Sequence, residues 1–161
     1  MSAALRAPAR RLGLACKARG ARIATAESCT GGGVAAAITD IPGSSAWFER
    51  GFVTYADDAK REMLGVKRPT LERFGAVSEQ VAREMAAGAL RRSRAGVSVA
   101  ITGIAGPGGA TPGKPVGLVW FAWAARGGEV QARAFRFKGG RDRVRRQSVA
   151  VALQGLVDLL R

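Results

Sequence analysis

The segment with the most chemical potential is the run Ala26-Glu27-Ser28-Cys29-Thr30-Gly31-Gly32-Gly33. The apolar residues 23–26 predict a strand before Ser28, and residues 34–38 predict a helix after the glycines. Ser28 is therefore expected between a strand end and a helix N-terminus, where backbone N–H groups are unpaired and carry partial positive charge. The glycines let a substrate approach the main chain closely. A catalytic turn built on Ser28 and an ordinary loop with Thr30 as N-cap both fit this pattern.

The chain has no histidine, which restricts how a hydroxyl nucleophile can be activated. Ser-His-Asp and Cys-His sites need an imidazole to carry the proton. The bases that remain are a lysine, a tyrosinate, a carboxylate or a metal-bound water. The two cysteines, Cys16 and Cys29, lack the spacing of a disulfide framework or a usual zinc cluster, so a reduced, cytoplasmic setting is expected.

Tyr55 and Lys60 form a second group of chemical interest. A strand expected over residues 51–55 places the phenol at a strand end, and the lysine falls on the first turns of the next helix. Burial lowers the pKa of a lysine, and a tyrosine hydroxyl can share a proton, so both are candidate bases for Ser28. A surface lysine beside a half-buried tyrosine is the alternative interpretation.

A glycine-rich loop follows the apolar strand expected over residues 97–102 and includes Thr102, Gly103 and Gly106. Such a loop can wrap a phosphate with its backbone N–H groups, or it can simply cross the surface. Residues 108–114 read G-x-x-x-x-G-K, but Pro115 replaces the Ser or Thr that would bind Mg²⁺. A nucleoside-triphosphatase P-loop is therefore excluded.

Arg141 and Arg145 lie four residues apart at the expected start of the last helix. Two guanidinium groups at a helix N-terminus suit a phosphate monoester or a carboxylate. A solvated charged face fits the same spacing.

The formal charge of +14 makes nucleic acid the first partner to consider, because phosphates attract clustered lysine and arginine. The basic residues are scattered, however, and no helix-turn-helix, zinc-finger or RNP pattern is present. We therefore expect solvated surface charge and no specific nucleic-acid partner. No segment reaches the roughly 20 apolar residues that cross a bilayer, so no membrane association is expected.

Helices and strands alternate along most of the chain. Periodicity and capping residues predict helices over residues 9–19, 34–39, 57–64, 78–90 and from 141 onward. Strands are expected over residues 23–26, 51–55 and 97–102, with a hairpin of 116–124 and 130–137 around Arg126-Gly127-Gly128. We expect one domain over residues 1–161 with an α/β fold, a three-layer α/β/α sandwich on a mixed β-sheet.

Six motifs, in order and at plausible spacing, resemble the CinA carboxy-terminal domain family, and the resemblance covers about residues 10–160. The motifs are Glu27-Ser28-Cys29-Thr30-Gly31-Gly32, Gly43-Ser44-Ser45-Ala46-Trp47-Phe48, Gly51-Phe52-Val53-Thr54-Tyr55, Gly75-Ala76-Val77-Ser78, Thr102-Gly103-Ile104-Ala105-Gly106-Pro107 and Lys114-Pro115-Val116-Gly117. Stand-alone members of this family are nicotinamide mononucleotide deamidases. The resemblance implies hydrolysis of the carboxamide of nicotinamide mononucleotide to nicotinic acid mononucleotide and ammonia, in pyridine-nucleotide salvage.

The resemblance also implies roles for individual residues. Ser28 matches the family's nucleophile, and Tyr55 and Lys60 match the groups that activate it, with no metal and no other cofactor. We expect the oxyanion to lie near the N–H groups of the Thr30-Gly31-Gly32 turn. Arg145 is expected to anchor the phosphate. The full set of expected substrate contacts is Thr30, Gly31, Gly32, Ser45, Thr102, Gly103, Gly106, Arg141 and Arg145.

A homodimer is expected mainly from the family. The apolar hairpin with Trp120, Phe121 and Trp123 is a candidate surface for contact with the second copy.

Three competing interpretations stay open at this point. Cys29 adjoins Ser28, so a cysteine amidase is the nearest enzymatic alternative. A non-catalytic nucleotide-binding or regulatory module of the same fold belongs to a different class. A basic nucleic-acid-binding protein is the third.

Overall fold

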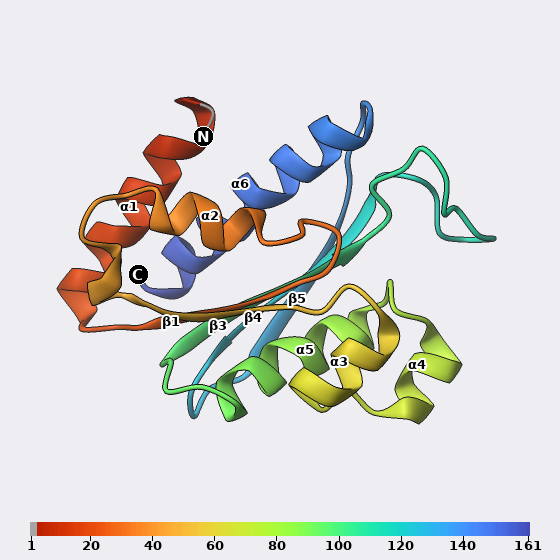
Figure 1. Cartoon of the computed structure of the whole chain (residues 1–161), viewed down its shortest axis with the longest axis horizontal. Helices are drawn as coiled ribbons and strands as arrows, with labels where there is room; N and C mark the ends of the chain where they lie inside the picture. The colour runs from red at the N-terminus through yellow and green to blue at the C-terminus, as the bar shows by residue number, and fades with distance from the viewer. Residues whose placement is uncertain (1–2) are drawn as a thin grey trace.

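A computed structural model describes residues 3–161, and it contains a five-stranded sheet between two layers of helices (Figure 1). The strands are β1 (Ile23–Glu27), β2 (Phe48–Val53), β3 (Val97–Gly103), β4 (Leu118–Ala125) and β5 (Val130–Arg136). Their order across the sheet is β2-β1-β3-β4-β5. β1 is parallel to both β2 and β3, whereas β4 is antiparallel to β3 and to β5. The expected α/β class with a mixed sheet is confirmed.

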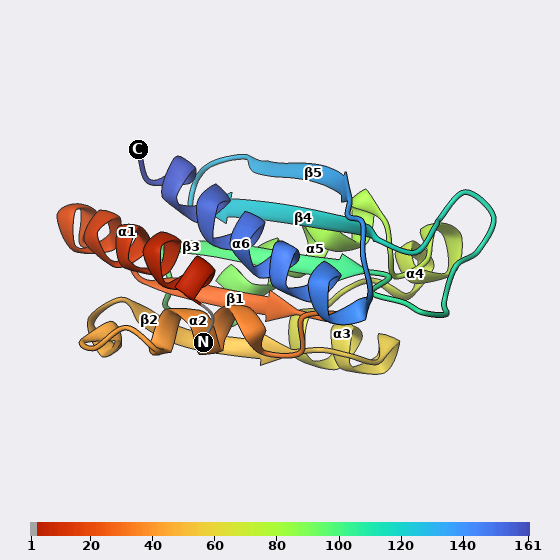
Figure 2. The same ribbon diagram turned by 90° about the horizontal axis from the view of Figure 1, so that it is seen from above.

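The two helical layers lie on opposite faces of this sheet (Figures 1 and 2). One layer consists of α1 (Ala3–Arg19), α2 (Gly33–Thr39) and α6 (Arg141–Leu159). The other consists of α3 (Asp57–Leu64), α4 (Arg68–Phe74) and α5 (Glu79–Arg91). A short 3-10 helix, η1 (Ser44–Ala46), precedes β2. No helix among residues 3–161 combines the length and apolarity that crossing a membrane requires.

Alternation along the strands gives the two faces different side chains. The face toward α5 presents small residues, and the face toward α1 and α6 presents large ones. The small set comprises Ala24, Ala26, Ala100, Ala122 and Ala124, and the large set includes Ile23, Ile101, Phe121 and Trp123. Gly155 of α6 fits against the Trp123 ring, because a Cβ atom at that position would lie 2.1 Å from a ring atom.

This packing corrects the expected contact surface of the hairpin. Phe121 and Trp123 are buried inside the chain, and their rings stack on each other with centroids 5.5 Å apart. The Trp123 indole N–H donates to the Ala152 carbonyl of α6 at 3.1 Å. These two rings are therefore not available to a second copy, and of the three named aromatics only Trp120 is partly exposed.

Several boundaries differ from the sequence-based expectation. β2 begins at Phe48, which lies opposite Ile23 of β1, and ends at Val53, which lies opposite Glu27. The pairing therefore stops where β1 stops. Tyr55 consequently follows the strand rather than lying on it. α1 begins at Ala3 and includes Pro8, so it is longer than expected. α4 was not expected, because its seven residues bury only Leu71 and are too few to show a helical period.

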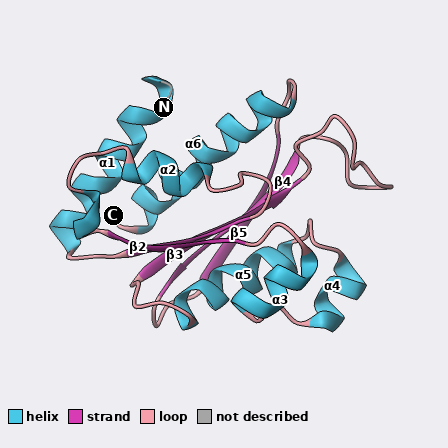
Figure 3. Cartoon of the chain, in the orientation of Figure 1, coloured by secondary structure: helices cyan, strands magenta, loops and turns pink. Residues whose placement is uncertain are grey.

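The arrangement of parallel strands decides where the site lies. The carboxyl ends of β1, β2 and β3 meet at one end of the sheet, and the loops that follow them are shown in pink in Figure 3. These loops carry Ser28, Tyr55 and the glycine-rich segment after Gly103. Ligands of open α/β sheets bind at this kind of edge.

Candidate active site

Lys60 is buried against Ser28 at this edge. Its Nζ atom lies 3.1 Å from the Ser28 Oγ, and it also donates to the carbonyl oxygens of Thr54 at 2.8 Å and Tyr55 at 3.1 Å. Lys60 is only 1% exposed and Ser28 9% exposed. None of these three hydrogen-bond partners is a carboxylate, so the ammonium donates only to neutral oxygens.

Burial lowers the pKa of Lys60 below its ordinary value of 10.5, and the Asp57 carboxylate opposes that shift. A lysine with a lowered pKa can release its proton and then accept the proton of the hydroxyl beside it. α3 makes this possible because it begins directly after β2, and Leu64 anchors it against α5. The geometry therefore places a candidate hydroxyl nucleophile beside a candidate amine base.

Glu27 organises the turn that carries Ser28, a role that the sequence analysis missed. The carboxylate is fully buried, and its Oε1 atom accepts from the Thr30 hydroxyl at 2.7 Å and from the Val34 N–H at 2.8 Å. Its Oε2 atom accepts from the Ala35 N–H at 3.0 Å. The N–H groups at the start of α2 are thus bound by a side chain of the protein itself and not left for a ligand. The signal available in the sequence was the carboxylate of Glu27 at the end of a mostly apolar strand, shortly before the predicted helix.

The same contacts correct the expected role of Thr30. The N-cap residue of α2 is Gly32, with φ 96°, and it has no side chain that could accept a hydrogen bond from the helix. The Thr30 hydroxyl instead points inward to Glu27. Gly31 and Gly32 both have positive φ, so the turn requires residues without a Cβ atom at these positions.

Arg145 holds the outside of the turn. Its Nε atom donates to the Cys29 carbonyl at 3.1 Å, and its Nη2 atom donates to the Thr30 carbonyl at 3.2 Å. A helix of the C-terminal end of the chain therefore fixes a loop near its N-terminal end. Arg145 does not line the pocket at Ser28, so the structure gives it a contact with the main chain where a phosphate contact was expected.

A pocket of about 260 Å³ opens beside Ser28 and Lys60. Its lining combines the Ser28 turn, the start of α3, the segment before α5, the loop after β3 and the start of α6. The lining residues are Ser28, Cys29, Tyr55, Asp57, Lys60, Ala76, Val77, Thr102, Gly103, Ile104, Ala105, Gly106, Gly108, Gly109 and Arg141. Among residues 3–161, no three carboxylate, thiol or imidazole side chains lie close enough together to hold a metal ion.

Arg141 connects two walls of the pocket. It donates through Nη1 to the Gly106 carbonyl at 2.9 Å and through Nη2 to the Tyr55 hydroxyl at 3.1 Å. The glycine-rich loop and the Ser28 turn thus line the same pocket. Thr102 lies in the lining too, but its hydroxyl donates to the Ala76 carbonyl at 2.8 Å.

Tyr55 lies at the pocket with its side chain 60% exposed. Its hydroxyl is bonded to Arg141, whereas its backbone carbonyl accepts from Lys60. The structure therefore brings the Lys60 amine to Ser28, and it brings the Tyr55 phenol to Arg141.

Cys29 also lines the pocket, but burial raises the pKa of its thiol to about 11. The thiol is then protonated at neutral pH and is a poor nucleophile. Ser28, with a base at 3.1 Å, is the better candidate.

Five of the nine expected substrate contacts lie outside the pocket lining, and Arg145, described above, is one of them. Thr30, Gly31 and Gly32 shape the turn from behind Ser28. Ser45 belongs to η1, which precedes β2, and it lies at the opposite end of the sheet from the carboxyl end of β1. Ser45 therefore lies away from the pocket beside Ser28, and its contact with a substrate stays a prediction. The motif that contains Ser45 carries no information about the direction of β2.

Comparison with known proteins gives consistent relatives. The nicotinamide-nucleotide amidohydrolase PncC of Escherichia coli K12 is 61% identical over 145 residues, which is 90% of this chain and 88% of the relative. The protein of the same name from Pseudomonas putida is 50% identical over 151 residues and covers 94% of both chains. The crystal structure of competence/damage inducible protein CihA from Agrobacterium tumefaciens has a TM-score of 0.97 and 51% identity, covering 100% of this chain and 98% of the other.

The family model described as the CinA C-terminal domain matches residues 6–160. That range includes all five strands and the whole pocket. The chain is therefore a member of the CinA C-terminal domain family.

Proposed function

We propose that this protein hydrolyses the carboxamide of nicotinamide mononucleotide to nicotinic acid mononucleotide and ammonia. The observation that carries the proposal is the Lys60 Nζ atom at 3.1 Å from the Ser28 hydroxyl, in a pocket that also presents Arg141 and a glycine-rich loop. Two of its relatives, both named nicotinamide-nucleotide amidohydrolase PncC, support this substrate.

The reaction would proceed in two halves. Neutral Lys60 takes the proton of Ser28 as the Oγ atom attacks the carboxamide carbon, and the protonated amine then gives a proton to the departing ammonia. This step leaves an ester between Ser28 and the nicotinoyl group. In the second half, Lys60 takes a proton from water, which attacks the ester and releases the carboxylate product as the proton returns to Ser28.

Backbone N–H groups of the Ser28 turn are the candidates for stabilising the oxyanion. The Gly31 N–H already donates to the Ser28 carbonyl at 3.0 Å, and Glu27 accepts from the N–H groups at the start of α2. The N–H groups of Cys29, Thr30 and Gly32 therefore remain as candidates, and of these three residues Cys29 lines the pocket. A well-placed donor of this kind typically contributes about 3 kcal/mol to the transition state.

The phosphate would lie toward the opposite wall. Arg141, Gly106, Gly108 and Gly109 line the pocket there, whereas Arg145 lies outside its lining and is bonded to the carbonyls of Cys29 and Thr30. We therefore assign the phosphate contact to Arg141 in place of Arg145. A guanidinium group beside a glycine-rich main chain suits a phosphate monoester.

The proposal extends to the setting of the reaction. Conversion of a nicotinamide nucleotide to its acid belongs to pyridine-nucleotide salvage, and two free, buried cysteines fit a reducing cytoplasm.

We retain the homodimer as part of the proposal, with half-buried Trp120 as the remaining hairpin aromatic that can contact a second copy.

Ammonia release from nicotinamide mononucleotide without added metal tests the proposal. Relative to the parent, Ser28→Ala should lower kcat/KM by about 10³-fold or more, because the nucleophile is lost. Cys29→Ala is the adjacent control and should change kcat/KM only a few-fold. A loss with Cys29→Ala equal to that with Ser28→Ala would indicate a cysteine amidase. A parent that binds the nucleotide but releases no ammonia would indicate a non-catalytic nucleotide-binding module.

A further inference from the structure

Asp57 is the one carboxylate that lines the pocket with Ser28 and Lys60. The side chain is exposed, and none of the ion pairs found among residues 3–161 includes it. The next residue, Asp58, differs on both points, since it lies outside the pocket lining and pairs with Arg61 at 3.3 Å. Asp57 therefore presents to whatever enters the pocket a negative charge that no ion pair among residues 3–161 holds.

The surroundings of Asp57 are strongly positive. Lys60 and Arg141 line the same pocket, and the chain carries a formal net charge of +14. This field favours the phosphate of a mononucleotide but repels a cationic ring. A ligand with a negative phosphate and a positive ring needs a negative group beside the ring. Asp57 is the carboxylate available for this among the lining residues.

Tyr55 supplies a second group suited to a cation. It is the only tyrosine in the chain, and its ring lies open at the pocket while Arg141 fixes the hydroxyl at 3.1 Å. The backbone of the same residue is held by Lys60. An aromatic ring fixed at both ends loses little freedom on binding, and its face attracts a quaternary nitrogen.

We propose that Tyr55 and Asp57 recognise the positive charge of the pyridinium ring, so that the pocket selects pyridinium amides over neutral aromatic amides of the same shape. This inference rests on the proposed function, because nicotinamide mononucleotide carries that charge on its ring nitrogen. Asp57 and Tyr55 are then residues that determine specificity, and Ser28 and Lys60 perform the chemistry.

Asp57 also faces Lys60 and raises the pKa of its amine, so the test must separate the two effects. A change in the protonation of Lys60 alters the turnover of charged and neutral substrates alike. Loss of ring recognition weakens only the charged ligand. Binding measured without turnover, on ligands that differ only in ring charge, separates these cases.

The experiment uses Ser28→Ala as the background and isothermal titration calorimetry as the measurement. The two ligands are nicotinamide mononucleotide and benzamide riboside 5′-phosphate, in which a carbon atom replaces the ring nitrogen and removes the charge. We expect the background protein to bind the charged ligand about tenfold more tightly. Adding Asp57→Asn should weaken the charged ligand about tenfold and change the neutral one less than twofold.

Three matched variants complete the design. Asp58→Asn should leave both dissociation constants unchanged, because Asp58 is outside the pocket lining. Tyr55→Leu should reduce the ratio of the two constants, and Tyr55→Phe, which keeps the ring, should preserve it. Equal weakening of both ligands by Asp57→Asn, or equal affinity in the background protein, would overturn the inference. Ammonia release by the parent, measured separately, tests the proposed function, so a charge-independent pocket in an active enzyme would refute only the inference.

Discussion

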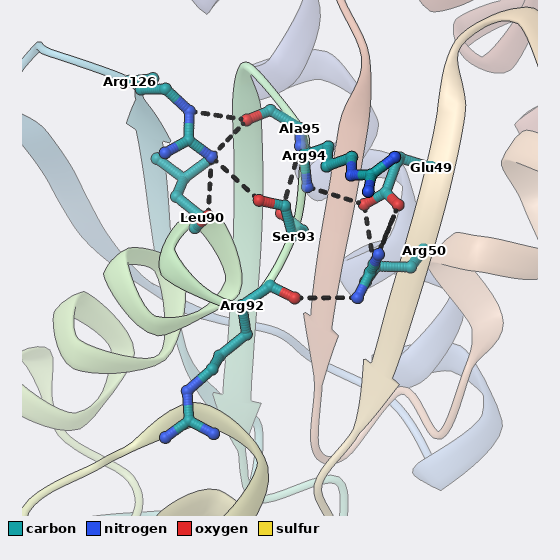
Figure 4. A network of polar contacts seen from close by, with 8 residues as sticks. All are labelled: Glu49, Arg50, Leu90, Arg92, Ser93, Arg94, Ala95 and Arg126. Carbon is teal, nitrogen blue, oxygen red and sulfur yellow. Dashed lines mark hydrogen bonds and ion pairs between the residues drawn. The ribbon is translucent and has the colours of Figure 1, made fainter.

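At the amino ends of β2 and β3, the Glu49 carboxylate accepts hydrogen bonds from the Arg50 guanidinium, at 2.8 Å, and from the Arg94 N–H, at 3.2 Å (Figure 4). At the carboxyl end of the same sheet, Lys60 donates only to a hydroxyl and two carbonyl oxygens. Hydrogen bonding to Arg50 lowers the pKa of Glu49 and favours its charged form. Burial lowers the pKa of Lys60 and disfavours its charged form. The sheet therefore keeps a paired charge at one end and an amine ready to lose its proton at the other.

Arg126 extends this contrast. It follows β4 and donates to the carbonyls of Leu90 at 2.7 Å, Ser93 at 3.2 Å and Ala95 at 2.9 Å (Figure 4). These carbonyls lie at the end of α5 and in the connection to β3, where helical hydrogen bonding stops. Arg126 thus stabilises the connection between α5 and β3 at the amino end of β3. Lys60 is also bound to carbonyl oxygens, but it has the Ser28 hydroxyl beside it.

Replacing Lys60 should have the largest effect on activity. Lys60→Met keeps the length of the side chain but removes the base, so kcat/KM for ammonia release should fall by about 10³-fold. The structure should persist, because methionine fills the same volume beside Leu64. Activity assays with circular dichroism at matched concentration check both points. A variant that retains a tenth or more of the parent activity would contradict the assignment of Lys60 as base.

The pH dependence sharpens the same assignment. Lys60 acts as a base only when neutral, so kcat/KM should rise with pH and level off below 10.5, the ordinary pKa of lysine. Because the pKa is lower in the folded state, the unfolded state binds more protons between the two pKa values, and the stability contribution of Lys60 increases with pH across that window. The gap in Tm between the parent and Lys60→Met should therefore shift in favour of the parent at alkaline pH.

Arg126→Met makes the same kind of replacement at the other end of the sheet. It should lower the free energy of unfolding by about 1 kcal/mol, since water can replace part of the lost hydrogen bonding to three carbonyls. The expected fall in Tm is about 2–4 °C for a chain of this size. Thermal denaturation and ammonia release measured together test the comparison. A loss of kcat/KM comparable to that of Lys60→Met would show that the two ends are not independent.

Glu49→Gln should have the smallest effect. The Glu49 side chain is only 8% exposed, but that of Arg50 is 45% exposed, and ion pairs that water reaches contribute little. Glutamine also keeps a side-chain oxygen that can accept from Arg50 or from the Arg94 N–H. Because the folded-state pKa of Glu49 is lowered, its contribution is present above the ordinary carboxyl pKa and is lost as the pH falls through the folded-state value. The Tm of the variant should thus approach that of the parent in acid. A Tm difference that stays constant with pH would contradict this pairing.

Local patterns predicted much of the fold correctly. The apolar run ending at Thr102, the hairpin around Arg126 and the helix capped by Ser78 all have strong short-range signals, and the Ser78 hydroxyl accepts from the Val81 N–H at 3.3 Å. α4 was missed because seven residues with one buried side chain show no period. The position of Ser45 before β2 could not be predicted, because a motif carries no information about which end of a strand it occupies.

The sequence by itself determined the succession of strands and helices along the chain, except for α4. It also determined the glycine turn after Ser28 and the absence of an imidazole base. These properties depend on neighbouring residues and on composition. Only the tertiary structure decided that Lys60 reaches Ser28 across 32 positions and that Arg145 holds the Cys29 carbonyl across 116. It also decided that Glu27, and not a ligand, occupies the start of α2. Periodicity fixes which face of an element is buried, but the pairing of distant elements and the direction of each side chain depend on packing between them.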